Sequence, residues 1–99
     1  MTTPAMPPFR SKAAVKRAMV VGSRWVMDHP GSGERRMFTG TVVRMSTTSR
    51  WLAWDDEPDS PPTWIPVSDT TGWVIEASGY VEEATGVRLR LADPTGSLI

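Results

Sequence analysis

The residues best suited to chemistry lie in one stretch, RWLAWDDEPDSPPTWIPV, which runs from position 50 to position 67. This stretch holds three of the five tryptophans and a group of four carboxylates, Asp55, Asp56, Glu57 and Asp59. Indole rings attract cations through their faces, and nearby carboxylates strengthen that attraction. The stretch therefore predicts a surface for an arginine- or lysine-bearing peptide, provided that two or more of the rings converge on one spot.

Other chemistries fit the sequence poorly. The carboxylates lack the glycine-centred spacing of a calcium loop, and His29, the only histidine, has no second zinc ligand type near it. A nucleophile elbow of the Gly-x-Ser-x-Gly type is missing, and the glycine-rich GSGERR at 31–36 lacks the Lys-Ser/Thr of a phosphate loop. We therefore expect a protein without metal, cofactor or enzymatic activity.

Strand alternation sorts the tryptophans onto two faces, because successive side chains of a strand point to opposite sides. Leu52 and Trp54 are expected in the core, and Trp51 then points outward. If the 50–55 and 63–67 strands pair antiparallel, Trp64 lies beside Trp51 on the outer face. The predicted core also contains Trp25, Val42, Ile65 and Val74.

The predicted partner-binding residues are Trp51, Trp64, Asp55, Asp56 and Phe38. Phe38 is uncertain in orientation, since Gly40 on the same strand is typical of a bulge. Asp55 could instead pair with an arginine such as Arg44 or Arg50. Two alternatives stay open: the C-terminal hairpin or a second subunit covers the tryptophan pair, or a one-residue register slip inverts the assignment.

Several short segments must position these residues. Residues 1–19 read as a basic, proline-bearing flexible arm, with one or two helical turns at 11–19 after Ser11 as a cap. Residues 29–36 read as a loop, and residues 68–72 as a turn of the 3₁₀ type. Alternation and turn residues predict strands at 20–28, 37–45, 50–55, 63–67 and 73–77, and a hairpin at 80–91.

The order VGSRW…TGTVV…WLAWDDE…WIPVSD…WVI, within residues 20–76, resembles the SH3-like barrels of the Tudor type. The resemblance implies an all-β chain, a small barrel of about five strands with a C-terminal β-hairpin. It divides the chain into an arm (1–19), the barrel (20–77), and the hairpin and tail (78–99). Type II dihydrofolate reductases share such a barrel, but Trp64-Ile65-Pro66 stands where they carry Gln-Ile-Tyr.

Charge is divided unevenly although the net charge is zero. Residues 1–50 hold nine bases and two acids, and residues 51–99 hold two bases and nine acids, so the halves carry +7 and −7. Either the halves pair with each other in the fold or the surface is bipolar. A bipolar surface would favour nucleic-acid binding through Arg10, Lys12, Lys16, Arg17, Arg35, Arg36 and Arg44, which precede the barrel or lie on its first strands.

The sequence thus favours a non-enzymatic protein-interaction module, such as a small accessory or inhibitor protein of a bacterium, phage or mobile element. Nucleic-acid binding is the alternative, and a type II reductase-like enzyme is a remote one. The absence of cysteine, of a long apolar run and of a secretory leader leads us to expect a cytoplasmic protein with no membrane partner. An exposed edge strand and a tryptophan patch make a homodimer plausible.

Overall fold

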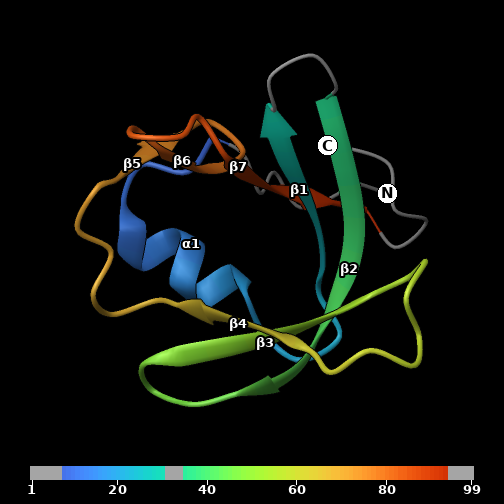
Figure 1. The fold of residues 1–99 in the computed structure, drawn as a ribbon. Helices are drawn as coiled ribbons and strands as arrows, with labels where there is room; N and C mark the ends of the chain where they lie inside the picture. The colour runs from blue at the N-terminus through green and yellow to red at the C-terminus, as the bar shows by residue number, and fades with distance from the viewer. Residues whose placement is uncertain (1–7, 31–34, 94–99) are drawn as a thin grey trace, which may run out of the picture.

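The computed structural model of the 99-residue chain describes residues 8–30 and 35–93. Within them, seven antiparallel strands form one sheet that curls into a half-barrel, and one short helix lies in its opening (Figure 1). The elements are α1 (Lys12–Ala18), β1 (Arg24–Pro30), β2 (Arg35–Met45), β3 (Ser49–Trp54), β4 (Thr63–Pro66), β5 (Trp73–Glu76), β6 (Gly79–Glu82) and β7 (Arg88–Ala92).

Two meanders make up the sheet. Strands β1 to β4 follow one another as neighbours, as do β5 to β7, and pairing of β1 with β7 joins the two sets. The strand order is therefore β4-β3-β2-β1-β7-β6-β5. Residues 67–72 cross from one edge of the sheet to the other, and Trp73 N–H donates to the Thr70 carbonyl to close the turn before β5.

The prediction of a closed five-stranded barrel is wrong. In such a barrel the 73–77 strand would pair with another of the five strands and close the sheet. Here β5 pairs with β6 alone and forms one edge of an open sheet, and β4 forms the other edge. The predicted C-terminal hairpin exists as β6 and β7, and its Leu89 and Leu91 are buried. It is part of the sheet rather than an appendage, because β7 occupies the position beside β1 and places β6 and β5 beyond it.

The irregularity of β2 is not where Gly40 predicted it. Pairing with β3 shifts register between Val42 and Arg44, which places the bulge at Val43. Gly40 serves a different purpose: a Cβ there would lie 2.7 Å from Cε3 of Trp54 and 2.9 Å from the Ala53 carbonyl oxygen. The glycine therefore leaves room for the indole of Trp54 to pack flat against β2.

The concave face of the sheet holds the core. Trp25, Val42, Leu52 and Ile65 are buried there as predicted. The prediction was wrong for Val74, which is 38% exposed. Its neighbours Trp73 and Ile75 pack against the core instead.

Helix α1 fills the opening between the two edges of the half-barrel (Figure 1). Ser11 caps it as predicted, its Oγ accepting the Ala14 N–H at 3.1 Å. Val15 and Met19 are fully buried in the core together with Phe9, so residues 8–19 of the expected arm are packed into the fold. Residues 1–7 of that arm lie outside the described residues. Among the helices described, none has the length and apolar character that a bilayer span requires.

Both ends of α1 are tied to the sheet by side-chain hydrogen bonds. At its start, Lys12 Nζ donates to the Thr70 carbonyl at 3.0 Å, and the Tyr80 hydroxyl donates to the Lys12 carbonyl at 3.2 Å. Burial raises the pKa of Tyr80, which keeps the hydroxyl protonated as a donor. The helix is thus held where it leaves the N-terminal segment.

The other end of α1 is held by the buried guanidinium of Arg50, which is 3% exposed. Its Nη2 donates to the Lys16 carbonyl at 3.2 Å and its Nε to the Met19 carbonyl at 2.5 Å. Nη1 donates to the carbonyls of Ser46 and Ser49 in the turn between β2 and β3. Desolvation lowers the pKa of Arg50, but a guanidinium still stays charged in proteins. One side chain therefore joins the C-terminus of the helix to the sheet.

We expect Arg50→Met to destabilise the protein by about 2–4 kcal/mol, because buried carbonyls of the helix end and the β2–β3 turn lose their donor. Urea unfolding followed by tryptophan fluorescence measures this loss. Arg36→Met, at an exposed site, is the control and should change stability by less than about 0.5 kcal/mol. Equal stabilities of the two variants would show that Arg50 does not hold the helix.

Candidate functional site

The predicted tryptophan pair exists on the convex face. Trp51 and Trp64 are directly opposite each other in the β3–β4 ladder, and Trp64 is 56% exposed. The hairpin β6–β7 does not cover them, since β7 lies beyond β2 and β1 in the sheet order. The predicted strand pairing and the outward orientation of Trp64 are therefore confirmed.

The two indoles do not form a cage for an external cation. The guanidinium carbon of Arg44 lies 4.6 Å from the ring centroid of Trp51, so a cation of the chain itself already occupies one face of that ring. Trp64 Nε1 donates to Ser49 Oγ at 2.8 Å, which fixes its ring along the sheet. Trp64 is thus a rigid exposed aromatic, while Trp51 is half-buried beneath an arginine.

Asp55 is engaged within the fold. Its partner is Arg24 rather than Arg44 or Arg50: Nη1 of Arg24 donates to Oδ1 at 2.8 Å and Nη2 to Oδ2 at 2.5 Å. Arg24 and Thr41 are cross-strand partners, and Arg24 Nη1 also donates to Thr41 Oγ1, which orients the guanidinium. The hydrogen bonds from Arg24 lower the pKa of Asp55 and raise that of Arg24. Asp56, one residue further on, is exposed in the loop that follows β3.

Several aromatic rings do converge on one space, but they lie at one end of the concave face rather than at the tryptophan pair. A cavity of about 300 Å³ opens there, which we call the aromatic pocket. It is lined by Met27, His29, Phe38, Trp54, Glu57, Ser60, Pro61 and Thr63. Three ring side chains and one carboxylate therefore surround a single space.

Strand register brings these rings together. Met27 and Phe38 are cross-strand partners on β1 and β2, and His29 follows Met27 on the same face. Trp54 on β3 is opposite Gly40 of β2, and Gly40 is two residues from Phe38 along β2. The loop between β3 and β4 contributes Glu57, Ser60 and Pro61 to the lining.

The rings are inclined to one another and enclose space. His29 meets Phe38 edge-on, with ring centroids 5.8 Å apart and planes at 85°. Phe38 and Trp54 have centroids 6.0 Å apart and planes at 57°. Trp54 Nε1 donates to Thr63 Oγ1 at 2.7 Å, and Ser60 Oγ donates to Oε2 of Glu57 at 3.2 Å. Both the largest ring and the carboxylate are therefore held in position.

The predicted basic residues do not form one surface. Two arginines near the predicted set are also engaged, since Arg24 is paired with Asp55 and Arg50 is buried against backbone carbonyls. Arg44 lies over Trp51, and Lys12 reaches Thr70. Exposed arginines remain at positions 10, 17 and 36, while Lys16 is half-buried and the side chain of Arg35 lies outside the description.

Sequence reasoning found Phe38 but missed its companions. His29 was assigned to a loop, whereas it lies in β1, which runs on to Pro30. Trp54 was assigned wholly to the core, and its edge is half-exposed at the pocket. A signal was available: Met27 and His29 alternate with Val26 and Asp28, and Phe38, Gly40 and Val42 share one strand face.

Comparison with models of protein families, with curated proteins and with solved structures finds no match for this chain. The resemblance to Tudor-type barrels stays a prediction, and the curled antiparallel sheet is the part that the structure supports. In the part of the chain that the structure describes, no group of three or more His, Cys, Asp or Glu side chains is placed to hold a metal ion.

We expect the Arg24–Asp55 pair to stabilise the protein only above acidic pH. The folded pKa of Asp55 lies below its unfolded value of about 3.9, so the contribution is complete above that value and disappears as pH falls through the folded pKa. Asp55→Asn should cost up to about 1 kcal/mol at pH 7, because the pair is partly exposed, and almost nothing near pH 2. Urea unfolding at both pH values measures the difference, and an equal loss at both would contradict the assignment.

We expect Gly40→Ala to displace the Trp54 ring, since the added Cβ would overlap its Cε3 atom. The cost should be about 1–3 kcal/mol, accompanied by a changed near-ultraviolet circular dichroism spectrum. Gly22→Ala is a matched control: Gly22 has φ +94°, so alanine strains the backbone, but no atom lies within 4 Å of the new Cβ. The near-ultraviolet spectrum should therefore change in Gly40→Ala alone, and an unchanged spectrum in that variant would refute the packing role.

Proposed function

We propose that this protein is a non-enzymatic protein-interaction module that takes a lysine or arginine side chain of a partner protein into the aromatic pocket. The observation that carries the proposal is the convergence of His29, Phe38 and Trp54 with the carboxylate of Glu57 around one cavity of about 300 Å³. This is the chemistry expected earlier of Trp51, Trp64 and the acidic stretch, at a different place in the fold.

The physical argument rests on complementary charge. Faces of aromatic rings attract a cation by about 0.5–2 kcal/mol, more where water is displaced. Among the described residues that line the pocket, Glu57 alone carries a full charge, and it adds a negative charge at the rim. The positive charge of Arg36 opposes the binding of a cation. Arg36 is the cross-strand partner of His29 and therefore lies close to the pocket, although it does not line it.

Trp64 lies next to the pocket at the edge of the sheet, on the opposite face of β4. This strand is an edge of the sheet, and Thr63, which lines the pocket, immediately precedes Trp64. A partner segment lying along the edge could meet both the pocket and the exposed indole. Tryptophan is among the residues that most often dominate the energy of protein interfaces, which fits a fixed and exposed Trp64 as a second anchor.

Nucleic-acid binding remains the second candidate, supported by the exposed Arg10, just before α1, and the exposed Arg17 in its last turn. The pairing of Arg24 with Asp55 and the burial of Arg50 remove two further cations from such a surface. The protein-interaction proposal is therefore the better supported of the two.

The test uses capped tripeptides, Gly-Lys-Gly and Gly-Arg-Gly, with Gly-norleucine-Gly as a neutral counterpart. Binding is followed through the indole N–H signal of Trp54 in NMR spectra. We expect saturable binding of the two cationic peptides at millimolar concentration. Glu57→Gln should weaken it about two- to fivefold by removing the negative charge, whereas Arg36→Gln should strengthen it by up to about twofold.

Glu83→Gln, at an exposed site in the β6–β7 turn, is the control and should leave binding unchanged. Norleucine binding as tightly as lysine, or no response to Glu57→Gln and Arg36→Gln, would refute a cation site. If the peptides fail to bind while a single-stranded oligonucleotide binds in low salt, and Ala substitutions at Arg10, Lys12, Lys16 and Arg17 abolish that binding, the nucleic-acid alternative is correct.

A further inference from the structure

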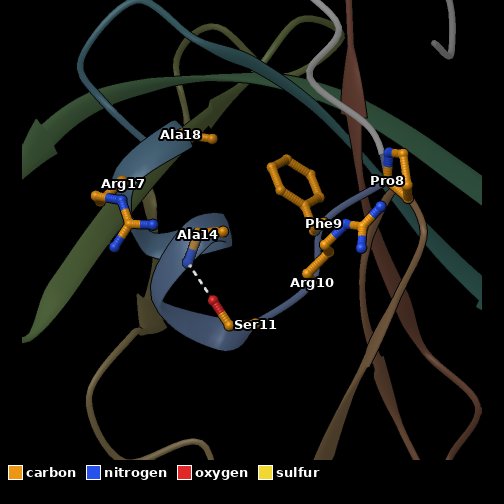
Figure 2. A pocket seen from close by; sticks show the side chains of 7 residues that line it. All are labelled: Pro8, Phe9, Arg10, Ser11, Ala14, Arg17 and Ala18. Atoms are coloured by element: carbon orange, nitrogen blue, oxygen red, sulfur yellow. Dashed lines mark hydrogen bonds between the residues drawn. The ribbon is translucent and has the colours of Figure 1, made fainter.

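A second hollow, of about 420 Å³, lies between α1 and the segment that leads into it (Figure 2) and shares no lining residue with the aromatic pocket. Its inner surface is apolar and formed by Phe9, Ala14 and Ala18. Figure 2 shows Arg17 on the helix side and Arg10 on the side of the preceding segment. The space is thus bounded by small apolar groups and flanked by two guanidinium side chains.

The small size of the helix residues creates this space. Ala14 and Ala18 are one turn apart on the same face of α1, and Arg17 is a neighbour of Ala14 at i,i+3 spacing. Larger residues at these two positions would fill the hollow with their own side chains. The volume lies within the range of about 300–1,000 Å³ that is typical of small-ligand sites.

The walls of the hollow are held firmly by the rest of the fold. Phe9 N–H donates to the Ala77 carbonyl at 2.9 Å, and the Phe9 ring stacks on Trp25 with centroids 6.3 Å apart. The helix side is fixed through Lys12 and Arg50, as described above. The two arginines therefore extend from backbone whose position does not depend on a ligand.

Neither arginine has an acidic partner. Within the described part of the chain, Arg10 and Arg17 take part in no ion pair and no side-chain hydrogen bond, and no carboxylate lines the hollow. A third donor is present: Ser11 Oγ accepts the Ala14 N–H, which leaves its hydroxyl proton free to donate. The polar rim is therefore rich in donors and positive, whereas the inner surface is apolar.

We propose that this hollow is a binding site for an oxyanion, a carboxylate or a phosphate, carried on a short apolar group. Either forked guanidinium group, that of Arg10 or that of Arg17, can bind an oxyanion with two parallel hydrogen bonds, and the apolar group would pack on Ala14, Ala18 and Phe9. A nucleic-acid base finds little to stack on here, because Phe9 is only 8% exposed. The site is independent of the aromatic pocket and of the function proposed for it.

The test titrates the full chain with four probes: hexanoate, hexyl phosphate, inorganic phosphate and hexylammonium. The amide signals of Ala14 and Ala18 in NMR spectra report on the hollow, and the Trp54 indole signal reports separately on the aromatic pocket. We expect saturable shifts of Ala14 and Ala18 with hexanoate, hexyl phosphate or both, and the stronger of the two identifies the natural oxyanion. Inorganic phosphate should bind at least about fivefold more weakly, because it lacks the apolar group.

Arg10→Gln and Arg17→Gln should each weaken binding about fivefold or more, since each removes charge-assisted hydrogen bonds. Lys16→Gln is the matched control: it removes the same charge from the same helix at a residue that does not line the hollow, and should change binding less than about twofold. Because both arginines are exposed, we expect their replacement to leave the fold intact. Unchanged signals from the rest of the chain will verify this.

The proposal is overturned if neither hexanoate nor hexyl phosphate gives saturable shifts at these two amides. It is also overturned if hexylammonium produces the same shifts, if inorganic phosphate binds as tightly as hexyl phosphate, or if both glutamine variants bind like the wild type. Because the aromatic pocket is monitored in the same spectra, failure here is distinguishable from failure of the proposed function.

Discussion

The architecture depends on the hydrogen bonds of one buried guanidinium. A curled sheet that does not close leaves an opening over its core, and a seven-residue helix is too short to be stable in water by itself. Arg50 resolves both problems, since it joins the carbonyls at the end of α1 to those of the β2–β3 turn. The side chain is buried, and its charge is shared among peptide carbonyls rather than neutralised by a carboxylate.

The helix separates the two candidate sites. It covers the core between the sheet edges, and the aromatic pocket lies at an end of the concave face where β1, β2 and β3 place aromatic side chains. Ala14 and Ala18 of the helix, together with the segment before it, line the arginine-flanked hollow. One site is aromatic with a negative rim and the other is apolar with a positive rim, so the uneven charge of the sequence is used locally as well as in the ion pairs that link its halves.

Most of the secondary structure could be predicted because it follows local rules. Alternation identified each strand within a few residues, and the cap at Ser11 identified the helix. The pairing that joins the two meanders could not be predicted, since nothing in the β6–β7 hairpin itself indicates that β7 pairs with β1, about sixty residues away. The role of Arg50 was hidden for a similar reason: its partners are backbone carbonyls, which any sequence supplies.

For the candidate site too, local features could be predicted and features that depend on distant contacts could not. Trp51 and Trp64 were correctly placed opposite each other, because period-two alternation fixes faces once the pairing is known. The presence of Arg44 over Trp51 depended on the bulge at Val43, which sequence reasoning placed at Gly40. His29 was missed because Pro30 and the glycines that follow it suggested that the strand ended earlier.

The pairing of β1 with β7 also has a consequence for how the chain acquires its structure. β1 is a central strand, and one of its two neighbours is synthesised only after almost every other element. Loop closure over such a separation costs entropy before any contact compensates for it, and non-local pairings of this kind slow folding. On the ribosome, the β1–β4 meander therefore emerges with one side of β1 unpaired, and the half-barrel is completed only when the last strand arrives.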